Sequence, residues 1–104
     1  MKGKELQDAI VALARMRGWR CAHFSPGRVG PRDSWITNYA YDSKGFPDLL
    51  LVRERIIGIE VKGDGDTMKQ EQHDWKDAFL AAGVEFYIAT PKAWREGFLD
   101  KVLK

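Results

Sequence analysis

The sequence has little of what several protein classes need. It holds one cysteine, Cys21, so an internal disulfide and a cysteine-based zinc cluster are both excluded, and a reducing cytosol suits it. No apolar run approaches the length of a membrane-spanning helix. Residues 1–5 contain two lysines and no apolar core of a signal peptide, so we expect an intracellular protein. Internal repeats and low-complexity segments are also lacking.

An excess of charge of one sign is also lacking. The chain of 104 residues carries 17 Lys and Arg against 15 Asp and Glu, which gives a net charge of +2. Such a balance permits nucleic-acid binding without requiring it, so any affinity for phosphate must come from local clusters of cations. The length and an apolar content of 44% predict one domain, residues 1–104, that buries its own core.

The centre of the sequence has the pattern of a β-hairpin. Two apolar runs rich in leucine and β-branched residues, 49–52 and 56–61, are separated by only three charged residues. This predicts two antiparallel strands joined by a tight turn. Charge stands at one end of the hairpin, because Asp48 opens the first strand while Glu60 and Lys62 close the second.

The length of the turn decides whether Asp48 joins the other two charges. A two-residue turn places Asp48 opposite Val61, on the wrong face, and the sequence lacks the glycine that such turns favour. A three-residue connection places Asp48 opposite Glu60 or Lys62. We therefore predict the three-residue connection, with the three charged side chains on one face of the sheet and an apolar face behind them. The apolar face comprises Leu49, Leu51, Ile57, Ile59 and Val61.

Two carboxylates and a lysine at a sheet end have two interpretations. Asp48, Glu60 and the backbone carbonyl of Val61 offer the oxygen ligands that Mg²⁺ or Mn²⁺ prefers. Lys62 can orient an attacking water and offset charge on a phosphoryl group. The alternative is a partly buried ion pair between Lys62 and one acid. Pro47, which fixes the backbone before Asp48, and the second acid, which stays uncompensated without a cation, favour the metal site.

Upstream of the hairpin we expect a helix and a strand. Residues 3–17 form an amphipathic helix that Gly18 ends. Glu5 lies at the edge of its apolar stripe, where it either complements the helix dipole or points inward. Residues 19–25 form a strand, in which His23 is interpreted as a satisfied strand histidine and not as a ligand. The helical stripe comprises Leu6, Ala9, Ile10, Leu13 and Met16.

Residues 26–44 are the least regular stretch, with at most a short strand over 35–41. Three cations, Arg28, Arg32 and Lys44, alternate here with aromatic residues. This suits a nucleic-acid surface, with cations for phosphates and rings for unstacked bases. The alternative is a solvated loop whose aromatic residues cover the core.

Downstream of Lys62, residues 63–66 are interpreted as a turn and not as a second metal site, because they lack the length and glutamate of a calcium loop. A capping box at Thr67–Gln70 begins a helix that runs to about Ala82. Gln72 lies in the apolar stripe of this helix. Since a buried amide needs a partner, Gln72 either bonds a backbone group or points at the charged cluster.

The chain ends in a strand over 84–89 and a last helix that begins at Thr90-Pro91. The order of elements predicts an α/β fold, a mixed β-sheet flanked by helices on both sides. The apolar stripe of the last helix either closes the core or forms an oligomer surface.

The hairpin motifs resemble those of a known nuclease superfamily. Gly45-Phe46-Pro47-Asp48, then a strand, a turn and Glu60-Val61-Lys62, is similar to the PD-(D/E)xK pattern. Within this superfamily, the chain resembles the VRR-NUC (virus-type replication-repair nuclease) branch. The residues that carry this resemblance are Glu5, Gly63, Gln72 and Trp75. The resemblance implies a restriction-endonuclease-like core and a divalent-metal-dependent DNA nuclease. It also implies a structure-selective endonuclease of the Holliday-junction-resolvase type that acts as a homodimer on branched DNA. The expected location is the cytoplasm, which for a phage-encoded protein is that of the host cell.

The resemblance further implies roles for named residues. Metal ligands are expected in Asp48, Glu60, the Val61 carbonyl and Glu5, which helps directly or through water, and the metal is Mg²⁺ or Mn²⁺. Lys62 positions the water, Gln72 orients ligands, and Arg28, Arg32 and Lys44 contact DNA. Three alternatives stay open: a non-catalytic DNA-binding module, an interaction domain in which the cluster is only an ion pair, and a sequence-specific restriction-type endonuclease.

Overall fold

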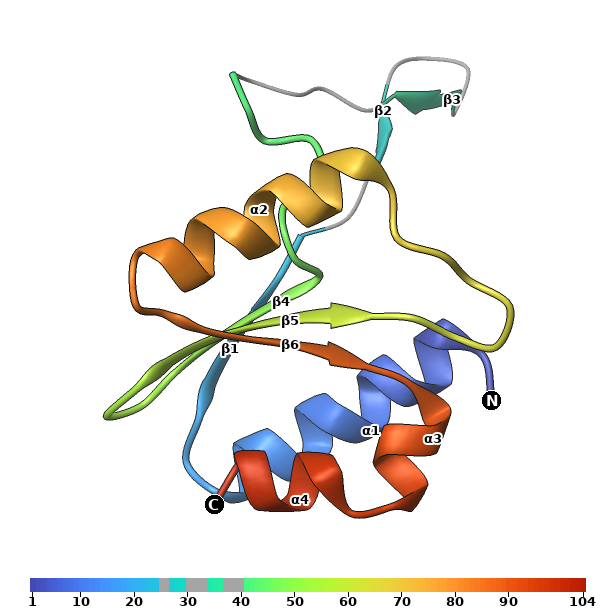
Figure 1. Ribbon diagram of the computed structural model, residues 1–104. Coiled ribbons are helices and arrows are strands. Elements are labelled where there is room, and N and C mark those ends of the chain that lie inside the picture. Colours follow the sequence, from blue (N-terminus) through green and yellow to red (C-terminus); the bar gives the residue numbers. More distant parts are fainter. Residues whose placement is uncertain (25–26, 30–33, 37–40) are drawn as a thin grey trace.

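A mixed sheet of four strands forms the centre of the molecule (Figure 1). The strands lie in the order β1-β4-β5-β6. β1 pairs with β4, and β4 with β5, in antiparallel fashion, whereas β6 is parallel to β5. Their bounds are Arg20–His23 for β1, Leu49–Val52 for β4, Ile56–Val61 for β5 and Glu85–Ala89 for β6.

The computed structural model describes residues 1–24, 27–29, 34–36 and 41–104. Within these, a separate two-stranded sheet is formed by β2 (Gly27–Val29) and β3 (Ser34–Ile36). The short strand expected at residues 35–41 therefore overlaps β3, and its remainder over 37–40 lies outside the described residues.

Helices cover both faces of the sheet, as predicted (Figure 1). α2 (Gln70–Ala81) lies on one face, and α1 (Gly3–Met16), α3 (Pro91–Arg95) and α4 (Phe98–Val102) lie on the other. Among the described residues, no helix combines the length and the apolar character needed to cross a membrane. The mixed sheet between helices confirms the α/β fold.

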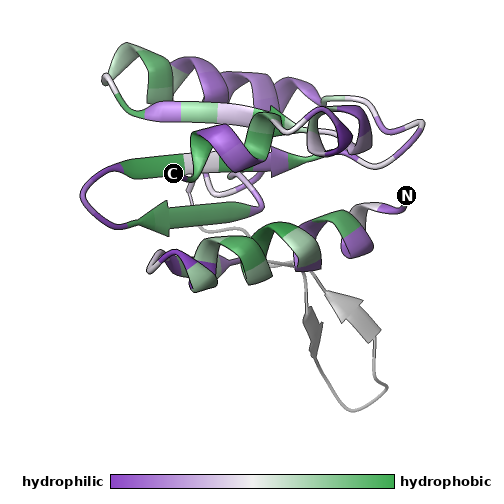
Figure 2. Cartoon of the chain, turned by 90° about the horizontal axis from the view of Figure 1, so that it is seen from below, coloured by the Kyte–Doolittle hydropathy of each residue, from purple (hydrophilic) through white to green (hydrophobic). Residues whose placement is uncertain are grey.

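The register of the central hairpin follows the predicted three-residue connection. Leu49 pairs with Ile59, and the ladder continues until residues 53–55 join β4 to β5. This register places Asp48, one residue before the first pair, opposite Glu60. Figure 2 shows the two strands as hydrophobic and the turn between them as hydrophilic. The predicted apolar face is buried at Leu49, Leu51, Ile57, Ile59 and Val61.

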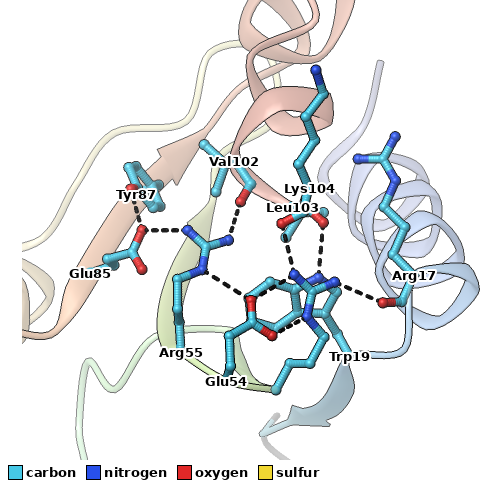
Figure 3. Close-up of polar contacts among 10 residues, drawn as sticks. Arg17, Trp19, Glu54, Arg55, Glu85, Tyr87, Val102, Leu103 and Lys104 are labelled. Carbon is cyan, nitrogen blue, oxygen red and sulfur yellow. Dashed lines mark hydrogen bonds and ion pairs between the residues drawn. The ribbon is translucent and has the colours of Figure 1, made fainter.

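Two arginines of the turn hold it in place (Figure 3). Arg55 donates to the Glu85 carboxylate at 3.2 Å and to the Val102 carbonyl at 2.6 Å. Arg53 donates to the Lys104 carbonyl at 2.7 Å. The turn that sets the register is thus tied to β6 and to the end of α4, and these ties oppose a slip of the hairpin by one residue.

The core lies between the sheet and the three helices on one face. Leu6 and Ile10 of α1 are buried as predicted, but Met16 is 84% exposed and Ala14 takes the next buried position. The buried positions follow a spacing of four residues, and this spacing turns Met16 away from the sheet.

Close packing of α2 on β5 depends on Gly58. A Cβ atom at this position would lie 2.6 Å from a ring carbon of Phe79 on α2 and 3.2 Å from the ring of Phe86 on β6. The Phe79 and Phe86 rings themselves meet edge to face, with centroids 5.6 Å apart. This contact brings α2 down onto the sheet, and with it the side chains of its first turn.

Two predicted helix boundaries are wrong. α2 begins at Gln70 and not at a cap on Thr67, because the Gln72 side chain accepts the Lys69 N–H at 2.8 Å. The predicted last helix is two short helices, because Gly97 interrupts it with a φ of 79°.

Candidate functional site

The charged cluster lies at one end of the sheet, where β4 begins and β5 ends. Asp48 Oδ2 accepts the Val61 N–H at 2.8 Å. Because Asp48 stands opposite Glu60 and because Lys62 is two residues from Glu60, all three side chains are on the α2 side of the sheet. The predicted geometry, with two acids and a lysine on one face, is the geometry of the structure.

Glu60 is the deeply buried member of this cluster, with 1% of the residue exposed. Its Oε1 accepts from Gln72 Nε2 at 3.0 Å and lies 3.5 Å from Lys62 Nζ. Its Oε2 is buried and has no hydrogen-bond partner in the described part of the chain. Leaving a buried acceptor unsatisfied costs about 1–3 kcal/mol, and more for a charged group. This atom therefore has the capacity to hold a proton or a cation.

Gln72 connects the cluster to α2. Its Oε1 accepts from Lys62 Nζ and from the Lys69 N–H, each at 2.8 Å, while its Nε2 donates to Glu60. The sequence left open whether this amide bonds a backbone group or points at the cluster. In the structure it bonds the Lys69 backbone and also contacts Glu60 and Lys62. One side chain thus starts the helix and fixes the positions of Glu60 and Lys62.

The electrostatics of the site are dominated by Glu60. Burial, and then the neighbouring Asp48 carboxyl, raises the pKa of Glu60 to about 8, and the Lys62 ammonium opposes this shift only in part. Near neutral pH the Glu60 carboxyl therefore tends to keep its proton when no cation is present. Such a pair is a candidate functional site on physical grounds.

A family model now adds to this geometry: residues 30–93 match the one described as the VRR-NUC domain. The chain belongs to the VRR-NUC family. The match spans more than half of the 104 residues and includes Asp48, Glu60, Lys62 and Gln72. VRR-NUC is a PD-(D/E)xK-like domain, so the function is of nuclease type. No curated protein and no solved structure matches the chain significantly.

The VRR-NUC cluster fits a hard divalent cation. The available donors are the carboxylates of Asp48 and Glu60 and the Val61 carbonyl, all of them oxygens. The unpartnered Oε2 of Glu60 is the atom that such a cation would satisfy. Within the described ranges, no group of three or more His, Cys, Asp or Glu side chains is arranged to hold a metal ion. A cation here would therefore rely on two carboxylates, backbone oxygen and water.

Glu5, the further predicted ligand, stands apart from these groups. It lies in the first turn of α1, on the opposite face of the sheet from α2, and is exposed. Its side chain has no hydrogen bond or ion pair with any residue that the structure describes. The start of α1 nevertheless packs against the turn after Lys62, because a Cβ on Gly63 would lie 2.6 Å from the Gly3 nitrogen. A role of Glu5 in the VRR-NUC site stays a prediction.

Of the three predicted DNA-contacting residues, the structure describes the side chain of Lys44 alone. Arg32, and the side chain of Arg28, lie outside the described residues. Lys44 is described, and its Nζ lies 3.2 Å from Glu71 Oε1 on α2 with 57% of the side chain exposed. Lys44 is therefore a cation at the surface that is partly neutralised by its neighbour.

One contact of the site was missed by sequence reasoning. The His23 Nδ1 atom lies 2.8 Å from the Asp48 carbonyl oxygen, and since a carbonyl can only accept, Nδ1 carries the proton. His23 is a satisfied strand histidine, as interpreted, but its partner is the backbone of a motif residue. The signal lay in the pairing of β1 with β4, which sets His23 beside Leu49.

Proposed function

We propose that this VRR-NUC domain is a divalent-metal-dependent DNA endonuclease. The observation that carries the proposal is the buried, unpartnered Oε2 of Glu60 beside Asp48, with Lys62 held at the same end of the sheet. A purely structural ion pair has no need of the second acid, whose presence raises the pKa of Glu60. Retaining both acids makes sense where a cation binds.

Asp48, Glu60 and the Val61 carbonyl would hold Mg²⁺ or Mn²⁺. When bound, the cation acts as a Lewis acid that polarises the phosphodiester and lowers the pKa of water. The chain itself prepares the place for it. The Val61 N–H fixes Asp48 Oδ2, and the Gln72 amide fixes Glu60 Oε1, so that the remaining oxygens are set before substrate arrives.

Lys62 is the group that we assign to the nucleophile and the transition state. The Lys62 side chain is 12% exposed, and its ammonium is held by Gln72 Oε1 and Glu60 Oε1, so its position is fixed and largely shielded from solvent. From there it orients the attacking water and offsets the negative charge that grows on the phosphoryl oxygens. Water adds to phosphorus and gives up a proton to the solvent, while the bond to the leaving ester oxygen breaks and that oxygen takes up a proton from the solvent.

We propose further that the enzyme selects DNA by structure more than by base sequence. Among the described residues, the elements form one four-stranded sheet with its helices and one two-stranded sheet, and the site lies at the end of the four-stranded sheet. Branched DNA, including junctions of the Holliday type, is the proposed substrate. A homodimer would place two such sites on opposite strands of a junction.

The test incubates the protein with labelled junction, flap and duplex DNA in Mg²⁺ or Mn²⁺, and with EDTA as the metal-free control. We expect cleavage of the branched substrates only with the metal. Glu60→Gln and Lys62→Ala should fold and lose cleavage by a factor of about 100 or more. Glu96→Gln and Lys101→Ala serve as matched controls, because both side chains are exposed and lie outside the cluster.

The alternatives give different results. A non-catalytic DNA-binding module would bind all these substrates equally with EDTA and cut none. A restriction-type enzyme would cut plasmid DNA at fixed sequences in preference to synthetic junctions. Cleavage that persists in Glu60→Gln or Lys62→Ala would remove the roles assigned to these residues.

A further inference from the structure

A second feature lies on the outer side of α2, one helical turn from Gln72. Here an open pocket of about 400 Å³ is formed between α2 and the segment that leads to Asp48. Gly45 anchors that segment, because a Cβ there would lie 2.5 Å from the Glu71 backbone. The pocket is lined by Tyr41, Asp42, Lys44, Glu71, Asp74, Trp75 and Ala78.

The two aromatic rings of this pocket differ in how they are held. Trp75 is fixed, since its indole N–H donates to the Asp42 carbonyl at 2.8 Å and its ring meets Phe46 edge to face at 4.9 Å. Tyr41 is fully exposed and makes no ring contact or hydrogen bond with the described residues. Its φ of 58° is in the left-handed region, which costs free energy for a tyrosine. A ring presented to solvent in a strained conformation, beside a rigid second ring, is suited to stacking with a flat ligand.

The charge of the pocket narrows the class of that ligand. Lys44 is paired with Glu71, so these two charges offset each other. Asp42 and Asp74 remain, and one oxygen of Asp74 already accepts from Gln70 at 2.9 Å. The Asp42 carboxylate has both oxygens free of partners among the described residues. The surplus of carboxylates disfavours phosphate in this pocket and favours a flat group that donates hydrogen bonds.

We infer that this pocket binds an unpaired guanine base of the DNA substrate, stacked at Tyr41 and Trp75 and held by the Asp42 carboxylate. Guanine offers two adjacent donors on its Watson–Crick edge, N1–H and N2–H₂, which match the two oxygens of a carboxylate. Thymine offers one donor between two acceptors, which the carboxylate repels. The inference rests on the proposed function, because it takes the pocket as a subsite beside a nuclease centre. An unpaired base is available at branched DNA and is accessible without breaking a base pair.

The test measures binding without cleavage, by fluorescence anisotropy in EDTA. The probes are a labelled short strand of thymidines alone and three matching strands in which the central position is a guanine, an inosine or an abasic site. Inosine keeps N1–H and lacks the N2 amino group, so it is the matched control for the second hydrogen bond. We expect the guanine strand to bind about tenfold more tightly than the inosine or all-thymidine strand.

The variants assign the contacts. Asp42→Asn should abolish the difference between guanine and inosine, and Asp74→Asn, in the same pocket, should leave it in place. Tyr41→Ala should weaken binding of the guanine strand several-fold and leave binding of the abasic strand unchanged. Equal binding of guanine, inosine and thymine by the unaltered protein overturns the inference, and so does loss of the preference in Asp74→Asn alone.

An organic cation is the other ligand that rings and carboxylates can bind. Competition by tetramethylammonium without any dependence on the base would show that the pocket binds cations, and would overturn the guanine inference. The proposed function has its own readout. Guanine-dependent binding without cleavage in Mg²⁺ would refute the nuclease and keep the pocket, whereas cleavage without base dependence would do the opposite.

Discussion

Gln72 Nε2 donates to Glu60 Oε1 at 3.0 Å, and this hydrogen bond joins the first turn of α2 to the end of β5. The same amide accepts from Lys62 at 2.8 Å, so one neutral side chain holds both the Glu60 carboxyl and the Lys62 ammonium. A neutral partner can orient both groups without neutralising either. This is the arrangement that a site needs if both charges are to act on a ligand.

Replacing Gln72 therefore tests positioning. Gln72→Ala removes the hydrogen bonds to Glu60, Lys62 and the Lys69 N–H together. We expect cleavage to fall by a factor of about 10–100, as is usual when a group that orients metal ligands is lost. The free energy of unfolding should fall by about 1 kcal/mol, because the helix cap is lost as well. Single-turnover cleavage and urea unfolding measure the two effects.

The matched variant is Gln72→Glu, which keeps an acceptor for Lys62 and for the Lys69 N–H but cannot donate to an ionised Glu60. It should retain much of the stability and lose the cleavage. Full activity in Gln72→Glu would show that the hydrogen bond to Glu60 has no part in the reaction.

The raised pKa of Glu60 makes the metal-free protein less stable at higher pH. Burial and Asp48 raise this pKa from 4.5 to about 8, so the folded state holds the proton more tightly than the unfolded state. The resulting stability is fully present below about pH 4.5 and is lost as the pH rises to about 8. We expect the free energy of unfolding in EDTA to fall across this window by an amount on the order of a few kcal/mol.

Glu60→Gln supplies the control, because a glutamine does not titrate. Its free energy of unfolding in EDTA should vary much less over the same pH window, and near pH 8 it should equal or exceed that of the unaltered protein. Adding Mg²⁺ should stabilise the unaltered protein most at the high-pH end and leave Glu60→Gln unchanged. A flat pH profile in EDTA for the unaltered protein would contradict the raised pKa.

The hairpin and its charges could be predicted because they depend on local chemistry. Three charged residues without glycine exclude the two-residue turn, and the period of a strand then decides which side chains share a face. The prediction that Asp48 shares a face with Glu60 and Lys62 needed nothing more. The same is true of the cap at Thr90, whose hydroxyl accepts the Ala93 N–H at 3.1 Å. The choice between Glu60 and Lys62 as the residue opposite Asp48 was left open, and the register of the structure makes it Glu60.

The features that sequence reasoning missed depend on contacts between distant segments. α2 starts at Gln70 because the Gln72 side chain, held by Glu60 and Lys62, occupies the N–H of Lys69. A local capping pattern at Thr67 carries no information about residues 60 and 62. The hydrogen bonds from Arg55 to α4 and from Arg53 to Lys104 beyond it are of the same kind, since two arginines in a turn give no sign of the carbonyls they reach.

Glu5 is the predicted ligand on which mutation is most informative. It is exposed and has no hydrogen bond or ion pair within the described ranges, so Glu5→Gln should leave the free energy of unfolding unchanged within about 0.5 kcal/mol. If Glu5 assists the cation through water, the variant needs more metal, and the Mg²⁺ concentration for half-maximal cleavage should rise several-fold. Asp8→Asn is the control, because Asp8 lies on the same helix, is also exposed, and forms a surface ion pair with Lys4. Identical metal dependence in the two variants would remove Glu5 from the site.

A side chain at position 58 is expected to lower the free energy of unfolding without changing the residues of the candidate site. In Gly58→Ala the new Cβ would lie 2.6 Å from a ring carbon of Phe79, so α2 must move or the ring must leave its position. Overpacking of this kind typically costs about 1–3 kcal/mol. Adding Phe79→Leu makes room for the methyl group, so the double variant should recover part of the loss caused by Gly58→Ala when each is compared with its own background. Urea unfolding of all four proteins measures the coupling, and strictly additive losses would mean that the two side chains do not share the space between α2 and β5.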